Sequence, residues 1–264
     1  MRPPRIAVPL RPADFNLRVE EVTITAADGV GLAGWLLPRP GAAAVVLLHG
    51  YPAEKADLLP LAAALHPRFT VLLMDLRFFG RSGGRVTTLG SRERDDLRRA
   101  VDFLEARGHR PVGVFGFSLG GAVALLAAAE DPRIRAVAAY AAFADLRLLG
   151  REAYAHFWLA KYPLVELMRV WSRLFLGTDV TRPAPVMAAA RLAIPVWLRH
   201  SRQDEQIAVR HAEQLRRALA ANPAAEVEIV AGGRHGDLGP EFERRLVEFF
   251  LRHLMTPRRH ALSP

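Results

Sequence analysis

The chain contains the stretch Pro111-Val112-Gly113-Val114-Phe115-Gly116-Phe117-Ser118-Leu119-Gly120-Gly121. Its first residues are apolar without polar alternation, which is typical of a strand buried on both faces. The alanine-rich residues 122–130 follow and predict a helix. Strand, tight turn and helix are the context in which Gly-x-Ser-x-Gly indicates a nucleophile elbow. We therefore expect Ser118 at the tip of a strained turn with its oxygen exposed. Gly116 and Gly120 would let the helix pass close to the strand, where a Cβ would clash.

Strands alternate with helices from residue 43 to the end of the chain. Continuous apolar runs predict further buried strands at residues 43–48, 69–74, 134–140, 194–198 and 227–230. Helical patterns fall at residues 55–65, 91–105, 209–221 and 240–254, the second with Ser91 as its N-cap. This alternation predicts a mostly parallel sheet with helices on both faces, and therefore an α/β fold.

The beginning of the chain has a different pattern. Residues 18–25 alternate apolar and polar side chains, and residues 32–37 form a second short apolar run. Ala27-Asp28-Gly29 between them is turn chemistry. We predict an antiparallel hairpin that precedes the parallel part of the sheet.

Residues 144–184 do not fit the alternation, because they are longer than one connecting helix requires. They are rich in aromatic side chains, among them Trp158 and Trp171. Ordinary core helices are one interpretation. The one we favour is a small helical cap over the carboxyl edge of the sheet, where ligands bind in open α/β sheets. Trp158 and Trp171 are then expected to line the substrate pocket.

The predicted organisation is one domain with short ends. Residues 1–17 are rich in Pro and Arg and predict a loosely held arm. Residues 18–255 form the single α/β domain that carries the cap. Residues 256–264 are expected to form a flexible basic tail, and we expect neither a secretory signal nor a transmembrane segment.

Composition excludes some classes of function. The formal net charge is +9, but most arginines alternate with Asp and Glu, as on a solvated helix face. We therefore expect no nucleic-acid partner. Cysteine is absent, which rules out disulfides and thiolate chemistry. The default expectation for location is the cytoplasm, and the sequence leaves the oligomeric state open.

Four motifs occur in the order typical of one family. They are His49-Gly50 after the third strand, Asp75-x-Arg77-x-x-Gly80-x-Ser82 after the fourth, the Ser118 elbow, and Asp204 followed by His235 after the last two strands. On these motifs the chain resembles the α/β-hydrolase family over residues 18–254. Within the family it resembles bacterial serine hydrolases that are often described as esterases or peptidase-like hydrolases of unknown substrate. His200-Ser201 departs from the His-Gly of many members at the loop before the acid.

The chemistry of a serine nucleophile requires the same residue types. A serine hydroxyl is a poor nucleophile unless a histidine accepts its proton, and a carboxylate must orient that imidazole. The chain order Ser, Asp, His matches this fold. We assign Ser118 as nucleophile, His235 as general base and then acid, and Asp204 as the orienting acid.

The resemblance implies further roles around the nucleophile. The backbone N–H groups of Leu119 and Tyr51 would form the oxyanion hole. His49 would shape that loop at the edge of the pocket rather than transfer protons. Asp75 and Arg77 are interpreted as structural.

Three other carboxylates compete with Asp204 for the role of the acid. Glu205 is adjacent in sequence, Asp237 is close to His235, and Asp145 follows the strand at residues 134–140. Asp145 is also suited to cap a helix. His211 lies within a helical pattern and is interpreted as a surface residue.

The predicted function is hydrolysis of carboxylic esters through an acyl-enzyme. Acyl thioesters are the near alternative, amides or peptides a less favoured one, and a non-catalytic binding protein on the same fold the alternative from another class. Epoxide hydrolysis and dehalogenation are disfavoured because those enzymes place a carboxylate at the elbow. No metal-ligand spacing and no Gly-x-Gly-x-x-Gly after a strand is present, so we expect neither a metal nor another cofactor.

Overall fold

The fold is built on one sheet of eight strands, in the order β1-β2-β4-β3-β5-β6-β7-β8. The structure is a computed structural model and is described for residues 2–255, so the predicted tail at 256–264 lies outside the described residues. β1 and β2 form the predicted antiparallel hairpin, β2 also pairs antiparallel with β4, and the remaining neighbours are parallel. The strands are β1 Glu20–Thr25, β2 Gly31–Leu37, β3 Ala44–Leu48, β4 Thr70–Met74, β5 Val112–Phe117, β6 Ile134–Tyr140, β7 Val196–Ser201 and β8 Ala225–Val230.

Helices cover both faces of the sheet, as the apolar runs predict. The helical elements are η1 Pro12–Phe15, η2 Lys55–Leu58, α1 Leu59–Leu65, α2 Glu93–Ala106, α3 Leu119–Ala128, α4 Leu146–Ala153, η3 Ala155–Ala160, α5 Lys161–Leu176, α6 Pro185–Ala189, α7 Val209–Ala218 and α8 Phe242–Leu254. One core cluster joins the sheet to α2, α3 and α7. The other joins it to α1 and α8. Every residue of β3 and β4 is buried, which explains why both strands lack polar alternation.

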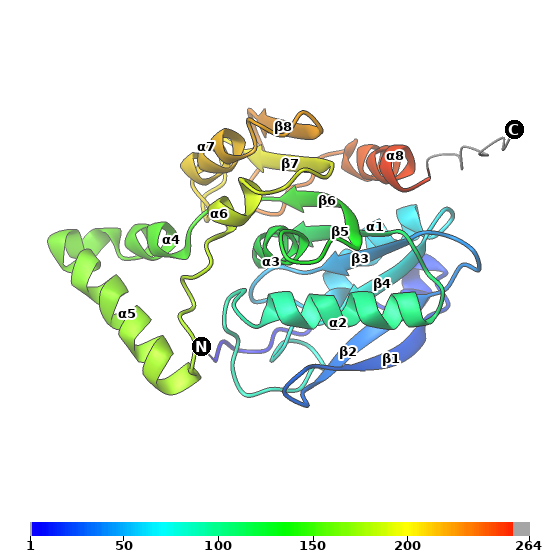
Figure 1. The fold of residues 1–264 in the computed structure, drawn as a ribbon, viewed down its shortest axis with the longest axis horizontal. Helices are drawn as coiled ribbons and strands as arrows, with labels where there is room; N and C mark the ends of the chain where they lie inside the picture. The colour runs from blue at the N-terminus through cyan, green and yellow to red at the C-terminus, as the bar shows by residue number, and fades with distance from the viewer. Residues whose placement is uncertain (1, 256–264) are drawn as a thin grey trace, which may run out of the picture.

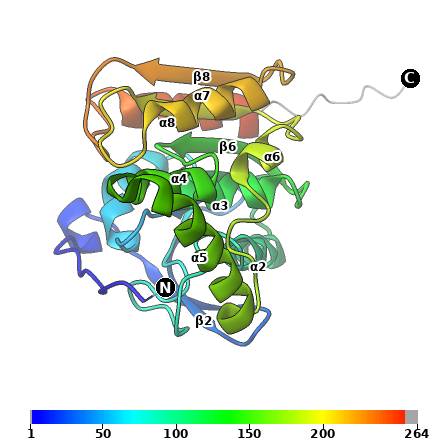
Figure 2. The same ribbon diagram turned by 90° about the vertical axis from the view of Figure 1, so that its left-hand side faces the viewer.

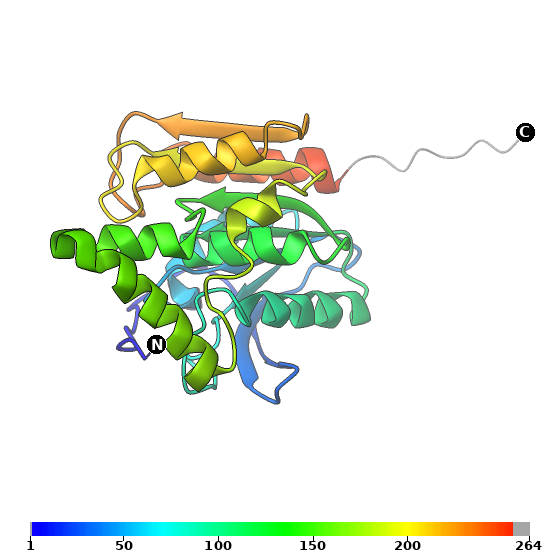
Figure 3. The same ribbon diagram turned by 60° about the vertical axis from the view of Figure 1, so that its left-hand side comes forward.

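The segment between β6 and β7 contains α4, η3, α5 and α6. The arrowheads of β3 and β6 point toward the side on which α4 and α5 lie (Figures 1 and 3). Viewed from that side, α4 and α5 stand in front of the sheet (Figure 2). This helical insertion therefore lies at the carboxyl edge of the strands. Within residues 2–255, no helix combines the length and the apolar character needed to cross a membrane.

The turn between β5 and α3 explains the glycines around Ser118. A Cβ placed on Gly116 would overlap the backbone carbon and oxygen of Gly120. A Cβ on Gly120 would overlap the carbonyl oxygen of Leu48 in β3. Backbone lies against backbone at both points, so neither contact can be relieved by a side-chain rotation.

We expect Gly116→Ala to destabilise the fold by several kcal/mol, as overpacking of a rigid core does. The matched control is Gly232→Ala, because a Cβ at Gly232 meets no atom within 4 Å. Urea unfolding of both variants tests the expectation. Equal stability of the two variants would contradict the close packing of this turn.

Two expectations about local structure are wrong. Ser91 does not cap α2, whose N-cap is Arg92. The Ser91 hydroxyl instead shares a hydrogen bond of 2.6 Å with Thr178 Oγ1, from the far end of the insertion. The N-terminal segment is held more firmly than a loose arm, because Arg5 donates to the carbonyl oxygen of Gly80 and the Val8 amide donates to Glu54. Both differences come from partners that are distant in sequence.

Candidate active site

Ser118 occupies a strained position between β5 and α3. Its backbone has φ 51° and ψ −112°, a region that residues with a Cβ rarely adopt. Its amide donates to the carbonyl oxygen of Tyr140 at 2.8 Å, and its carbonyl oxygen accepts from the Ala122 amide. The turn is therefore fixed from both sides. Ser118 as a whole residue is only 6% exposed, and it lines a cavity beneath the insertion.

Asp204 and His235 come together from two loops at the same sheet edge. Asp204 follows β7 and His235 follows β8, and His235 Nδ1 lies 2.8 Å from Asp204 Oδ2. The other carboxylate oxygen of Asp204 accepts from the amides of Gln206 and Ile207. Burial acts to raise the pKa of Asp204, but the hydrogen bonds from His235 and Ile207 outweigh it and hold this pKa below its usual range. The carboxylate is therefore ionised at neutral pH and oriented toward the imidazole.

His235 lies against the residue that precedes Ser118. The ring centroids of His235 and Phe117 are 4.9 Å apart. Phe117 also stacks on Tyr140, whose hydroxyl donates to the carbonyl oxygen of Asp237 at 2.7 Å. Burial, with the charges of Asp204 and Asp237, raises the pKa of Tyr140 to about 12, so this hydroxyl stays a donor. Tyr140 thus fastens the loop of His235 to the strand beside Ser118, a role that sequence reasoning missed.

Ser201 and His200 support the two loops, although the sequence departs from the family pattern here. The Ser201 hydroxyl donates to the carbonyl oxygen of Gly233 and accepts from the Gln203 amide. His200 is fully buried, and its Nε2 lies 2.8 Å from the carbonyl oxygen of Ile207. Ser201 therefore joins the Asp204 loop to the His235 loop.

The three other carboxylates have different partners. Asp145 caps α4 by accepting from the amides of Arg147 and Leu148. Glu205 accepts from the backbone amide of His235 rather than from its ring. The Asp237 carboxylate accepts from the Gly239 amide. Asp204 is thus the carboxylate that meets the His235 ring.

The loop after β3 lies directly against Ser118. A Cβ on Gly50 would come within 3.2 Å of Ser118 Cβ. Tyr51 and Leu119 line the same cavity as Ser118. Leu119 is the first residue of α3, so its amide has no acceptor within the helix. Both residues that we expect to supply the oxyanion hole therefore lie at the cavity that Ser118 lines.

The cavity has a volume of about 380 Å³ and mostly apolar walls; we call it the first cavity. The insertion contributes one side, with Leu146, Leu149 and Met168. The loop that precedes α2 contributes Leu89. If a ligand binds in the first cavity, its apolar portion next to Ser118 would be enclosed largely by side chains of the insertion.

The three residues expected in the pocket lie elsewhere, since the described lining of the first cavity includes none of them. His49 is fully buried; its Nδ1 contacts the Gly50 carbonyl oxygen and its Nε2 accepts from the Leu76 amide. Trp158 is 76% exposed. Trp171 borders a neighbouring cavity. The length and the aromatic content of residues 144–184 therefore predicted the insertion, but not which of its side chains face the site.

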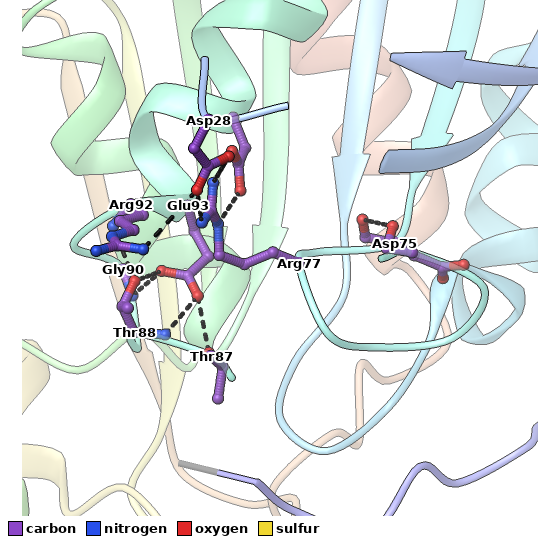
Figure 4. A network of polar contacts seen from close by, with 10 residues as sticks. Asp28, Asp75, Arg77, Thr87, Thr88, Gly90, Arg92 and Glu93 are labelled. Carbon is purple, nitrogen blue, oxygen red and sulfur yellow. Dashed lines mark hydrogen bonds and ion pairs between the residues drawn. The ribbon is translucent and has the colours of Figure 1, made fainter. Parts of the chain in front are cut away.

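Asp75 and Arg77 have structural partners beneath the site. Asp75 is fully buried and pairs with Lys55 Nζ. Arg77 forms ion pairs with Asp96 and with Asp28. Figure 4 shows the pair with Asp28. These ion pairs join the loop after β4 to neighbouring elements, in agreement with the structural interpretation.

The interpretation of His211 as a surface residue is wrong. His211 is fully buried on α7. Its Nδ1 accepts from the Ala144 amide, and its Nε2 lies 3.1 Å from Glu152 Oε2. His211 therefore anchors the start of the insertion to the main body, and no local pattern signalled this contact.

We expect the protein to lose stability as pH falls below about 6.5. Burial lowers the pKa of His49, His200 and His211. The unfolded chain then binds more protons than the native one, so the free energy of unfolding falls by up to about 1.4 kcal/mol per pH unit for each histidine. His211→Gln should make this dependence shallower, whereas replacing the exposed His156 by Gln should leave it unchanged. Urea unfolding between pH 7.5 and pH 5 is the measurement; equal slopes for both variants would contradict this origin.

Comparison with known proteins agrees with the fold described above. The family model for the alpha/beta hydrolase fold matches residues 43–163. The esterase Pf2001 of Pyrococcus furiosus superimposes with a TM-score of 0.78 at 26% identity, over 96% of this chain and 99% of that chain. The chain has the α/β-hydrolase fold.

Two sequence relatives extend the comparison. The uncharacterized protein YqkD of Bacillus subtilis is 28% identical over 73% of this chain. The thiohydrolase aneE of Aspergillus aculeatus is 35% identical over 44% of this chain. The chain spans 65% of the length of YqkD and 39% of the length of aneE.

Proposed function

We propose that this α/β hydrolase cleaves carboxylic esters through an acyl-enzyme formed on Ser118. The observation that carries the proposal is the 2.8 Å contact between His235 Nδ1 and Asp204 Oδ2, beside a strained Ser118 that lines an apolar cavity. A nucleophile, a base and an orienting acid are the groups that acyl transfer requires.

In the proposed mechanism each residue has one task. Ser118 Oγ attacks the ester carbonyl while His235 Nε2 accepts its proton. His235 then returns the proton to the leaving alcohol, and water repeats the sequence to release the acid. The ionised Asp204 holds Nδ1–H and stabilises the imidazolium. The amides of Tyr51 and Leu119 would donate to the oxyanion of each tetrahedral intermediate.

Thioesters are the second candidate substrate. The same three groups attack an acyl thioester, and a relative of this chain carries the name thiohydrolase. The apolar walls of the first cavity suit an apolar acyl part in either substrate class. Small-molecule esters and thioesters with such an acyl part are therefore the substrates to test.

The experiment combines a covalent label with a substrate panel. A fluorophosphonate should modify Ser118, as located by mass spectrometry of the digested protein. Aryl esters, acyl thioesters and acyl anilides with matched acyl groups then rank the three bond types. Highest kcat/KM on the esters supports the proposal, and highest kcat/KM on the thioesters replaces it with the second candidate. A protein that takes no label and cleaves no panel member would be a binding protein on this fold.

A further inference from the structure

A second apolar cavity lies next to the first and shares two lining residues with it. Its volume is about 120 Å³, and Trp171, Leu176 and Val180 form much of its lining. Leu89 and Met168 border both cavities. These two side chains, one from the loop that precedes α2 and one from α5, therefore separate the space beside Ser118 from the space beyond it.

Leu89 is held in place by an arrangement that the proposed chemistry does not use. Its φ is 53°, in the left-handed region that a leucine rarely adopts. Glu93 is fully buried, and its carboxylate accepts from the amides of Thr88 and Gly90 on either side of Leu89. It also accepts from the hydroxyls of Thr87 and Thr88 (Figure 4). One buried carboxylate thus fixes the loop and keeps Leu89 directed at the boundary.

The same loop is fastened to the helix that carries Met168. Ser91 Oγ and Thr178 Oγ1 are 2.6 Å apart, and Arg92 donates to the Leu176 carbonyl oxygen at 2.6 Å. These contacts join the start of α2 to the end of α5. Leu89 and Met168 are therefore held opposite each other by polar contacts on both sides of the boundary.

We infer that Leu89 and Met168 form the end wall of the acyl pocket and set the longest acyl chain that the enzyme accepts. The inference rests on the proposed function, because the chain is the acyl part of an ester bound at Ser118. Removing either side chain would join the two cavities and admit a longer chain. The ligand of the joined space is a linear saturated acyl chain, since the shared walls are apolar.

The test is the acyl-length profile of three variants on 4-nitrophenyl esters from acetyl to dodecanoyl. Met168→Ala shortens one side of the wall. Leu89→Gly removes the other, and glycine adopts a positive φ without strain. Each methylene accommodated in an apolar pocket changes kcat/KM by about tenfold or more. We expect the ratio of kcat/KM for the dodecanoyl ester to that for the butanoyl ester to rise at least tenfold in both variants. Leu174→Ala, on the same helix but 74% exposed, should keep the wild-type ratio.

Unchanged ratios in both Met168→Ala and Leu89→Gly, with the butanoyl ester still cleaved, would overturn the wall while leaving the proposed function standing. A rise in Leu174→Ala equal to theirs would overturn it too, because the effect would then come from general loosening of α5. If one variant fails to fold, the other decides. A wild-type protein that neither cleaves any ester nor reacts with a fluorophosphonate at Ser118 would instead remove the proposed function, and the inference with it.

Discussion

Ser118→Ala should lower ester turnover by about a millionfold, as loss of the nucleophile does in other serine triads. The reason is that Ser118 supplies the hydroxyl of the strained turn between β5 and α3, where it lines the first cavity. Residual turnover would come from the oxyanion donors and from substrate binding alone. The measurement is kcat on the best ester of the panel, with a fluorophosphonate to report active wild-type contamination.

The variant retains a Cβ at the same backbone position, so its fold should be preserved. Circular dichroism and thermal unfolding check this directly. Near-normal kcat in a pure, unlabelled Ser118→Ala preparation would show that the reaction takes place elsewhere.

Asp204→Asn should lower kcat by about 10⁴, the effect of the same change in a chymotrypsin-type triad. His235 Nδ1 lies 2.8 Å from the Asp204 carboxylate. In the proposed mechanism this contact leaves Nε2 free to take the Ser118 proton. An amide group can donate to Nδ1 instead, which stabilises the wrong tautomer. The hydrogen bonds from Gln206 and Ile207 reach the other oxygen, so the loop itself should keep its shape.

Three matched variants separate this role from a general loss of negative charge. Glu205→Gln, Asp237→Asn and Asp145→Asn should each lower kcat by about tenfold at most. Their carboxylates bind backbone amides rather than the His235 ring. If Asp145→Asn were the inactive variant and Asp204→Asn stayed active, the acid would lie after β6 and the interpretation of α4 would change with it.

Several features of the fold followed from short-range patterns. Continuous apolar runs predicted β3 and β4, because a strand buried on both faces has no room for polar side chains. The turn after β5 was readable because its steric demands fall on residues only two to four positions apart, Gly116, Ser118 and Gly120. The order of Ser118, Asp204 and His235 along the chain was sufficient to expect them at one sheet edge.

Other features depended on contacts that no local pattern carries. His211 has the spacing of a helix residue, yet it is buried because the insertion begins against α7, 67 residues away from its partner Ala144. Ser91 resembled an N-cap, but its partner Thr178 is 87 residues away. Trp158 and Trp171 were expected in the pocket on composition, whereas the direction of each side chain depends on how α5 packs on the body.

The boundary between the two cavities, formed by Leu89 and Met168, is another feature that depends on contacts between distant segments. Both residues are apolar in the sequence, but nothing in the sequence predicts that their side chains meet. The two side chains meet because the buried Glu93 carboxylate fixes the loop of Leu89. On the other side, Ser91 and Arg92 bind the end of the insertion that carries Met168. The proposed nucleophile could therefore be predicted from a local pattern, because the strained turn depends on neighbours in sequence. The size of the space beside it was decided only by tertiary structure, because its walls come from segments far apart in the chain.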